Sequence, residues 1–292
     1  MTDLALRPRR SVLYMPAANE RALEKAKSIP TDAIIFDLED AVAPDAKSQA
    51  RQNAADATAS GLYGRRELTI RCNGLDTPWG AEDLVAIAAS GASAVVVPKV
   101  STIDYVQQIS ALLDAAAAPS TMKIWAMIET PLAMFNVRSI ASHHRVDVLV
   151  MGTNDLAREL RSDLSAAGRH PLLPHLATAL LAAREADITI LDGVFNDVHN
   201  ADGFRHECQQ GFEMGFDGKT LIHPGQVDAC NLVWTPTPQQ VDHARRVIAA
   251  FDEAIVEGRG VATVDGRMIE NLHVANAQRL LAVADSIQDD PR

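Results

Sequence analysis

Eight short runs rich in valine, isoleucine and leucine recur along the chain, each followed by a longer segment with helical periodicity. This alternation is typical of repeated strand and helix units around a parallel sheet. The predicted strands are Ser11–Met15, Ala33–Phe36, Leu68–Arg71, Ala94–Val97, Ile124–Met127, Val148–Met151, Ile188–Leu191 and Phe216–Ile222. The pattern therefore restricts the chain to an α/β architecture.

Eight parallel strands can close into a barrel, which leaves no sheet edge exposed. The alternative, an open doubly wound sheet, usually has a glycine-rich turn after its first strand. Here the segment Tyr14–Ala18 occupies that position and contains no glycine. We therefore predict a (β/α)8 barrel, the TIM barrel, whose active site lies at the carboxyl ends of the strands.

The chain is longer than such a barrel requires, since it has 292 residues and single barrels commonly have about 250. After the eighth unit, Pro238 precedes a helix predicted from about Gln239 to Glu257, followed by glycine turns, a hairpin-like stretch and a final helix. We predict a barrel domain over residues 1–235 and a C-terminal helical and hairpin extension over residues 236–292. The extension either packs on the barrel or covers the site as a lid.

The composition argues against two classes of partner. The formal net charge is -11 and the basic residues form no run or face, so we predict no nucleic-acid partner. Arg7, Arg9 and Arg10 are followed by no apolar stretch long enough for a signal peptide or a membrane span. The three cysteines lack the paired spacing of a zinc or redox site and are expected to be reduced. We therefore expect a cytoplasmic protein without a membrane partner.

Polar residues follow most of the predicted strands, at the rim where a barrel has its active site. Glu129 follows the fifth strand and Asp155 follows the sixth, so both carboxylates are expected at the same mouth. Magnesium often takes one or two carboxylates and fills its other positions with water and substrate oxygens. The pair is therefore a candidate metal site, although two solvated loop carboxylates would give the same pattern.

The segment after the sixth strand suits an anionic ligand. Gly152, Thr153 and Asn154 lie where this strand turns into a helix, whose free backbone N–H groups could bind a substrate carboxylate. An Asn or Asp helix cap without a ligand is at least as common for such a segment.

The turn after the second strand is crowded with acidic residues, which are Asp37, Glu39 and Asp40. So many carboxylates require cations or N–H donors nearby. Arg71, which ends the third strand, could bind a substrate carboxylate through two parallel hydrogen bonds, or could pair with Asp37 or Glu39 in a structural role. Lys47 and Arg51 lie one helical turn apart and are predicted to be structural counter-ions for the same turn.

Four segments match a known family. They are Arg10–Pro16, Asp37–Pro44 followed by Lys47 and Arg51, Ile128–Thr130, and Gly215–Lys219 with Ile222–Pro224. These segments are spread over residues 10 to 225 and thus cover most of the chain. On them the sequence resembles the citrate lyase β-subunit-like proteins, which include malyl-CoA and citramalyl-CoA lyases.

The resemblance implies a TIM barrel with a C-terminal extension, assembled as a homotrimer or as a hexamer of two trimers. It implies that Glu129 and Asp155 bind Mg²⁺, or Mn²⁺ in its place, and that Arg71 contacts the substrate and stabilises its developing charge. The segment from Gly152 to Asn154 is then expected to contact the substrate as well. The acidic residues of the turn after the second strand would contact these groups rather than the substrate; they are Asp37, Glu39 and Asp40.

Coenzyme A enters this interpretation as part of the substrate. By the resemblance, Tyr14, Arg21 and Lys25 fall where the family contacts coenzyme A, although Arg21 stands where a lysine is often found. The acyl-CoA lyases also carry an aspartate on a C-terminal lid from the neighbouring subunit, which acts as acid or base. Glu270 stands in that position here. Its carboxylate reaches about one methylene further, and a displacement near 1 Å can cost about a hundredfold in rate.

The resemblance therefore implies a magnesium-dependent carbon–carbon lyase with Arg71 and Glu270 as catalytic residues. Its substrate would be a 3-hydroxyacyl-CoA such as malyl-CoA or citramalyl-CoA, which is cleaved to a shorter thioester and a 2-keto acid or formed from them. Three alternatives remain: a citrate lyase β subunit acting on a carrier-protein thioester, an acyl-CoA thioesterase, and a catalytically degenerate barrel that binds a metabolite.

Overall fold

Eight parallel strands form a closed barrel in the computed structural model, which describes residues 7–164 and 168–288. Each strand pairs with the next along the chain, and β8 completes the circle by pairing with β1. The strands are β1 (Ser11–Pro16), β2 (Ala33–Asp37), β3 (Glu67–Arg71), β4 (Ala94–Val97), β5 (Lys123–Ile128), β6 (Val146–Met151), β7 (Thr189–Asp192) and β8 (Gly218–Leu221). The predicted (β/α)8 barrel is confirmed.

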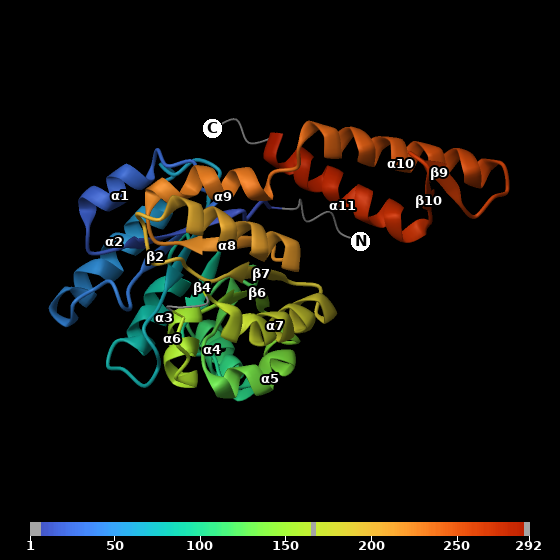
Figure 1. The fold of residues 1–292 in the computed structure, drawn as a ribbon. Helices are drawn as coiled ribbons and strands as arrows, with labels where there is room; N and C mark the ends of the chain where they lie inside the picture. Colours follow the sequence, from blue (N-terminus) through green and yellow to red (C-terminus); the bar gives the residue numbers. More distant parts are fainter. Residues whose placement is uncertain (1–6, 165–167, 289–292) are drawn as a thin grey trace. The chain divides into compact units, whose positions relative to one another are not determined.

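Helices lie around this barrel (Figure 1). They are α1 (Glu20–Ala26), α2 (Lys47–Ala59), α3 (Gly80–Ala88), α4 (Ile103–Ala115), α5 (Pro131–Ala141), α6 (Thr153–Leu160), α7 (Leu173–Glu185), α8 (Ala201–Met214) and α9 (Val227–Trp234). Short 3₁₀ turns lie at Pro44–Ala46, His170–Leu172 and Pro224–Gln226. Within the described residues, no helix has both the length and the hydropathy that crossing a membrane requires.

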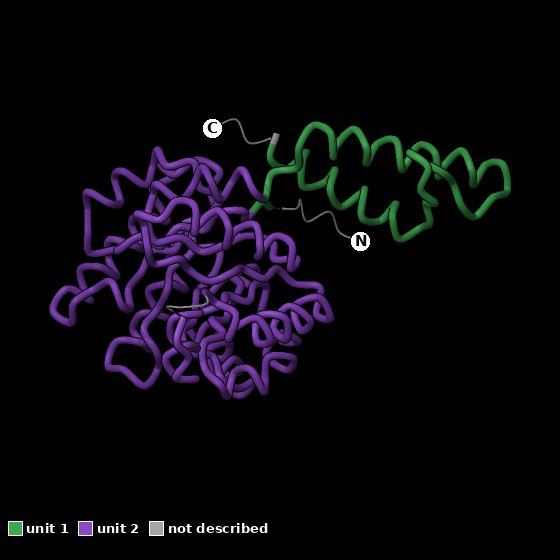
Figure 2. Tube along the Cα trace, viewed as in Figure 1, with its two compact units in different colours: residues 1–8, 234–292 green, residues 9–233 purple. Residues whose placement is uncertain are grey.

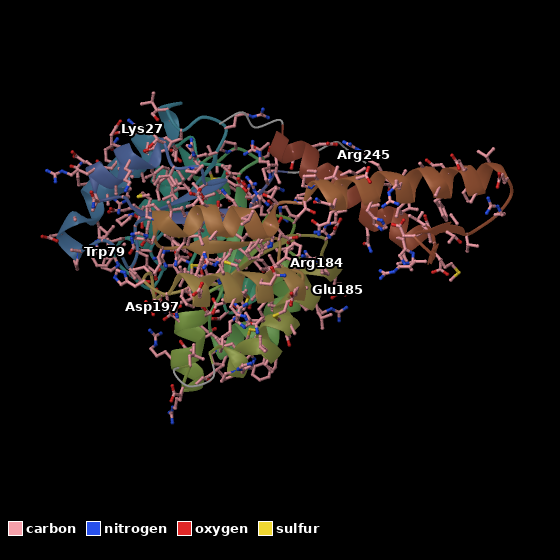
Figure 3. All side chains as sticks on the ribbon, turned by 45° about the horizontal axis from the view of Figure 1, so that its top comes forward. Lys27, Trp79, Arg184, Glu185, Asp197 and Arg245 are labelled. Carbon is pink, nitrogen blue, oxygen red and sulfur yellow. The ribbon has the colours of Figure 1, made fainter. Side chains whose placement is uncertain are left out.

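The eighth strand is shorter than predicted. Phe216 and Asp217 belong to a turn rather than to β8, because Gly215 ends α8 with a left-handed φ of 104° and redirects the chain. Arg184, near the end of α7 (Figure 3), holds this turn by an ion pair with Asp217 at 2.9 Å. The ladder with β7 therefore begins at Gly218.

Alternate strand residues point into the barrel, as the two-residue period of a strand requires. Ile35 and Trp125 belong to a buried cluster with members from most of the strands. Toward the carboxyl ends, the same alternation leads from Ile35 to Asp37 and from Trp125 to Glu129, both of which line a cavity. The strand pattern itself therefore places acidic side chains at the barrel mouth.

Arg9 closes the opposite end of the barrel. Its guanidinium binds Glu67 at 2.7 Å and Asp147 at 2.8 Å, and it donates a hydrogen bond to Thr189. It also lies over the Trp125 ring, 5.1 Å from the ring centroid. These partners come from the beginnings of β3, β5, β6 and β7, so one side chain links several strands at their amino ends.

The C-terminal region forms a second compact unit together with the described part of residues 1–8 (Figure 2). It contains α10 (Pro238–Val256), a hairpin of β9 (Ala262–Val264) and β10 (Arg267–Ile269), and α11 (Asn271–Gln288). The unit has its own core, in which Val247 and Phe251 of α10 pack with Ile269 and Val274. Helix α10 begins and ends within one residue of the predicted limits, Gln239 and Glu257.

Candidate active site

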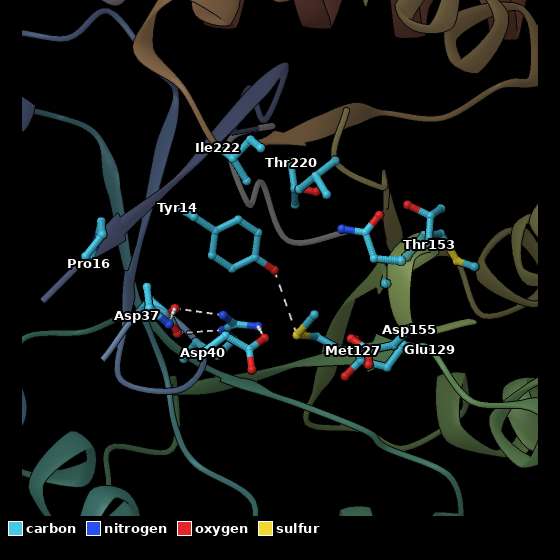
Figure 4. A pocket seen from close by; sticks show the side chains of 16 residues that line it. Tyr14, Pro16, Asp37, Asp40, Met127, Glu129, Thr153, Asp155, Thr220 and Ile222 are labelled. Atoms are coloured by element: carbon cyan, nitrogen blue, oxygen red, sulfur yellow. Dashed lines mark hydrogen bonds and ion pairs between the residues drawn. The ribbon is translucent and has the colours of Figure 1, made fainter. Parts of the chain in front are cut away.

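A cavity of about 340 Å³ opens at the carboxyl ends of the strands. Its lining brings together nine of the predicted site residues (Figure 4). They are Tyr14, Asp37, Asp40, Arg71, Glu129, Gly152, Thr153, Asn154 and Asp155. Residues that are up to about half the chain apart in sequence therefore share one cavity, because the barrel gathers the ends of β1, β2, β3, β5 and β6.

Glu129 is the most buried carboxylate in this lining apart from Asp37, with 2 % of the residue exposed. Its Oε1 accepts a hydrogen bond of 2.7 Å from the backbone N–H of Lys99. Burial raises the pKa of Glu129 to about 7; the Lys99 hydrogen bond opposes this rise, and the nearby Asp155 charge adds to it. A buried carboxylate with a second negative charge beside it is suited to a cation.

Asp155 lies in the first turn of α6, beside Glu129 in the cavity lining (Figure 4). Its Oδ1 pairs with Arg158 at 2.5 Å, and the Arg158 side chain is largely exposed. Gly152 precedes α6 as its N-cap, so no N-cap side chain accepts a hydrogen bond from the first N–H groups of this helix. The residues of this first turn line the cavity. The helix start thus offers donors to an anionic ligand.

Gly152 is required by the position of Glu129. A Cβ at residue 152 would lie 2.1 Å from Oε2 and 2.4 Å from Cβ of Glu129, which is far inside van der Waals contact. Any larger residue would therefore displace the glutamate.

The two carboxylates fit magnesium better than they fit zinc. Within the described residues, no group of three or more His, Cys, Asp or Glu side chains is arranged to hold a metal. Structural zinc sites usually take four protein ligands, and catalytic ones three. Glu129 and Asp155 supply oxygen atoms only, which leaves other coordination positions for water and substrate, as Mg²⁺ prefers.

Arg71 is held in the cavity by acidic partners from the turn after β2. Its Nε and Nη2 bind the two oxygens of Asp37 at 2.6 and 2.7 Å, and its Nη1 binds Glu39 at 2.8 Å. The guanidinium carbon also lies 4.9 Å from the ring centroid of Tyr14. Of the two interpretations of Arg71, the pairing with Asp37 is thus observed, and the guanidinium still lines the cavity where a ligand could reach it.

The pKa values of Asp37 and Glu39 are shifted in opposite directions by this arrangement. Burial opposes ionisation of Asp37, but the Arg71 charge and its hydrogen bonds outweigh burial and lower the pKa of Asp37. For Glu39 the opposite holds, since burial exceeds the effect of Arg71 and raises the pKa. The acidic turn therefore contains one strongly ionised carboxylate and one that is more easily protonated.

The prediction for Lys47 and Arg51 is correct for only one of the two residues. Lys47 Nζ donates to the backbone oxygens of Leu38 and Glu39, each at 2.7 Å, and so supports the acidic turn. Arg51 does not face this turn: it pairs with Asp83 at 2.7 Å and with an exposed glutamate of α3. The expectation for Arg51 was wrong because the side chain turns toward the neighbouring helix, whose carboxylates are closer.

The predicted coenzyme A contacts lie in two different environments. Tyr14 lines the cavity, and its hydroxyl donates only a weak hydrogen bond to the sulfur of Met127 at 3.8 Å. Arg21 and Lys25 lie one turn apart on α1 and are exposed to solvent. Tyr14 therefore lies in the same cavity as Arg71 and Glu129, whereas the two basic residues lie on a helix surface.

Glu270 belongs to the C-terminal unit and directly precedes α11. Its backbone N–H donates to Nδ1 of His273 at 3.0 Å, which fixes the start of this helix. Glu270 itself is partly buried.

Some parts of the site were not predicted. Thr220 and Ile222 also line the cavity; the strand alternation in β8 could have identified them. Lys219, the second residue of β8, is instead fully buried and pairs with Asp192 at 3.0 Å and Glu207 at 2.8 Å. No pattern in the sequence indicates these partners.

The chain matches known proteins over nearly its full length. The HpcH/HpaI aldolase/citrate lyase family model matches residues 10–224. A (3S)-malyl-CoA thioesterase of Cereibacter sphaeroides is 48% identical over 280 residues, which are 96% of each chain. The citrate lyase subunit beta of Escherichia coli is 36% identical over 285 residues, covering 96% of this chain and 94% of that one.

The fold also matches a solved structure. The protein CitE from Mycobacterium tuberculosis, in complex with magnesium, acetoacetate and coenzyme A, superimposes with a TM-score of 0.77 and 26% sequence identity. The match covers 94% of this chain and 97% of that one. The extent of both comparisons establishes the relationship: the chain belongs to the HpcH/HpaI aldolase/citrate lyase family.

Proposed function

We propose that this protein is a magnesium-dependent enzyme of acyl-CoA metabolism that cleaves the carbon–carbon bond of a 3-hydroxyacyl-CoA such as malyl-CoA or citramalyl-CoA. The observation that carries the proposal is the convergence of Glu129, Asp155 and Arg71 on one cavity at the barrel mouth. Two carboxylates for a cation and a guanidinium for an anion are the groups that such a substrate requires. The magnesium and coenzyme A in the related CitE structure support the same assignment.

Glu129 and Asp155 are the residues that would hold the divalent cation, Mg²⁺ or Mn²⁺. When bound, the cation would polarise the hydroxyl and carboxylate oxygens of the substrate and offset negative charge. Gly152, Thr153 and Asn154 would present the N–H groups at the start of α6 to a substrate carboxylate. Asp37 holds Arg71 in one orientation, so that its charge stabilises the enolate of the departing thioester without reorganisation. Glu39 and Asp40 bind Arg71 from the solvent side.

The remaining groups would bind the coenzyme A part of the substrate and transfer a proton. Arg21 and Lys25 are exposed cations on α1 that suit the phosphates of coenzyme A, and Tyr14 lines the cavity. Glu270, brought to the site as a lid from a neighbouring subunit of a trimer or hexamer, would protonate the enolate carbon, or remove the α-proton in the synthetic direction.

Thioester hydrolysis is the second candidate activity, because a relative with 48% identity is a (3S)-malyl-CoA thioesterase. In that case water replaces the thiol of coenzyme A and a free hydroxy diacid is released. The same cavity could bind the substrate for either reaction, so the products decide between them. The citrate lyase β subunit reaction on a carrier-protein thioester is a third option, supported by the 36% identity to such a subunit.

One experiment separates these activities. Purified protein with Mg²⁺ is incubated with a panel of 3-hydroxyacyl-CoA thioesters, and the products are identified by mass spectrometry. We expect a 2-keto acid and a shorter acyl-CoA; a hydroxy diacid and free coenzyme A identify a thioesterase instead. Turnover that is the same in EDTA, or equal in Glu129→Gln and wild type, refutes the proposed metal site.

A further inference from the structure

The turn after β4 contains an uncommon backbone conformation. Lys99 has a φ of 51°, in the left-handed region that residues other than glycine rarely adopt. The other non-glycine residues with positive φ in the described part of the chain are Ala117, Arg161, Asp187 and Asp265. Each of those lies at the end of a helix or in the β9–β10 hairpin turn, where this conformation is ordinary. Lys99 differs because it follows a strand at the barrel mouth.

This conformation directs the backbone N–H of Lys99 to Glu129. The N–H donates to Oε1 at 2.7 Å, and this is the only hydrogen bond to the Glu129 carboxylate among the described residues. On the opposite side, the other oxygen packs against Gly152 so closely that no Cβ fits there. The carboxylate is therefore held between a fixed donor and a fixed backbone surface.

Neighbouring hydrogen bonds hold the turn itself in place. The N–H of Val100 donates to the Met127 oxygen at 3.2 Å. Ser101 Oγ donates to the Lys99 oxygen at 3.1 Å and lies 2.7 Å from Oγ1 of Thr130, the N-cap of α5. A strained conformation persists where the surrounding contacts specify it in this way, and such positions are frequent at functional sites.

The side chain of Lys99 does not contribute to this hydrogen bond. Its Nζ pairs with Oε1 of Glu39 at 3.2 Å, and the other oxygen of Glu39 binds Arg71. The side chain is 49 % exposed, so its charge is partly screened by solvent. Hydrogen bonding thus gives the backbone and the ammonium group of Lys99 different partners, although the ammonium charge also interacts electrostatically with Glu129 and Asp155. Substitutions can test the two groups separately.

We propose that Lys99 is a positioning residue that orients Glu129 for metal binding through its left-handed backbone and not through its charge. The inference rests on the proposed function, because it takes Glu129 as a metal ligand. It adds to that function a residue that acts through its backbone conformation rather than through the chemistry of its side chain.

Three substitutions at this position remove the ammonium group but differ in how well they adopt a positive φ. Lys99→Gly and Lys99→Asn accept the left-handed region, whereas the β-branched side chain of Lys99→Val opposes it. Mn²⁺ serves as the probe, and its affinity is measured from the electron paramagnetic resonance signal of the free ion. We expect Lys99→Gly and Lys99→Asn to bind Mn²⁺ within about twofold of wild type and Lys99→Val to bind about tenfold more weakly.

The matched control is Ala117→Val, which places the same β-branched side chain at another exposed left-handed position, after α4. It should lower the melting temperature without changing the Mn²⁺ affinity. If Lys99→Gly, Lys99→Asn and Lys99→Val all weaken binding equally, the ammonium group is responsible and the proposal is overturned. Where Glu129→Gln binds Mn²⁺ more weakly than wild type, equal affinity in wild type and Lys99→Val overturns it as well.

Metal-free crystal structures of Lys99→Gly and Lys99→Val separate this inference from the proposed function. We expect the Glu129 carboxylate to keep its hydrogen bond in the glycine variant and to move in the valine variant. If wild type and Glu129→Gln bind Mn²⁺ equally, the proposed metal site fails, while a displaced Glu129 in Lys99→Val still supports the positioning role. An unmoved Glu129 in that variant overturns it.

Discussion

A methyl group on Gly152 would lie 2.1 Å from Oε2 of Glu129, so the absence of a side chain at one residue sets the position of the other. The contact joins the segments that follow β6 and β5, two neighbouring strands after which the carboxylates of the candidate metal site lie. The geometry of this site therefore depends on backbone packing as much as on its acidic residues.

Gly152→Ala tests this dependence directly. The added Cβ must displace Glu129, and we expect Mn²⁺ affinity to fall about tenfold or more, with a loss of stability of about 1–3 kcal/mol from overpacking. Gly260→Ala is the control, because a Cβ there meets nothing within 4 Å and its φ is not positive. Calorimetric titration and thermal unfolding measure both quantities. Unchanged Mn²⁺ affinity in Gly152→Ala would show that Glu129 is not a ligand in this orientation.

Glu129→Gln should change how stability depends on pH. In the metal-free protein, burial raises the pKa of Glu129 from 4.5 to about 7, so the folded state binds more protons than the unfolded state between these values. Wild-type stability must then decrease as pH rises through this window, by up to about 1.4 kcal/mol per pH unit, and the decrease is complete above pH 7. The glutamine variant lacks this contribution.

The measurement is urea unfolding in EDTA at intervals from pH 5 to pH 8. We expect the stability difference between Glu129→Gln and wild type to grow in favour of the variant as pH rises. Added Mg²⁺ should stabilise wild type at pH 8 but leave the variant unchanged. A pH-independent difference would show that Glu129 is not protonated in the metal-free fold.

Arg71→Lys should reduce turnover without weakening metal binding. Lysine keeps the charge but loses the two parallel hydrogen bonds to Asp37, so the cation is no longer held in one orientation. We expect kcat/KM to fall about a hundredfold, as for the loss of one preorganised charge-stabilising group. Mn²⁺ affinity should stay within about threefold. Arg51→Lys, at an arginine that pairs with Asp83, is the matched control for the same exchange away from the cavity.

The sequence predicted the barrel and its rim because both depend on local patterns. Each strand is a short apolar run, and its two-residue period determines which side chain after the run points into the barrel. Asp37, Arg71 and Glu129 were therefore expected at the barrel mouth from their positions, whereas their roles were implied only by the family resemblance. Gly152 was predicted as part of a helix start that could bind an anion, although the sequence did not reveal that its backbone packs against Glu129.

The remaining features depend on contacts that no local pattern encodes. The φ of Lys99 is set by its hydrogen-bonded surroundings, and lysine itself gives no signal for it. Arg51 was assigned to the wrong acids because a long side chain on a helix can reach partners on either side. The burial of Lys219 with Asp192 and Glu207 requires knowledge of how α8 packs on β8, which the sequence pattern does not provide.

Glu270→Ala tests the proposed acid or base. Because Glu270 belongs to the C-terminal unit and not to the cavity lining, we expect the variant to bind Mn²⁺ like wild type while turnover falls by about 10²–10⁴, the usual contribution of a general acid or base. Glu270→Asp shortens the side chain by one methylene and shows whether the longer reach is needed. Wild-type turnover in Glu270→Ala would remove this residue from the mechanism.

Hybrid oligomers then show which subunit supplies the lid. Glu129→Gln and Glu270→Ala subunits are each expected to be inactive alone. If the lid comes from a neighbouring subunit, coexpression of the two with different affinity tags yields hybrids in which some sites combine an intact Glu129 with an intact Glu270, and activity returns. If each subunit covers its own site, every site lacks one of the two residues, and the purified hybrids stay inactive.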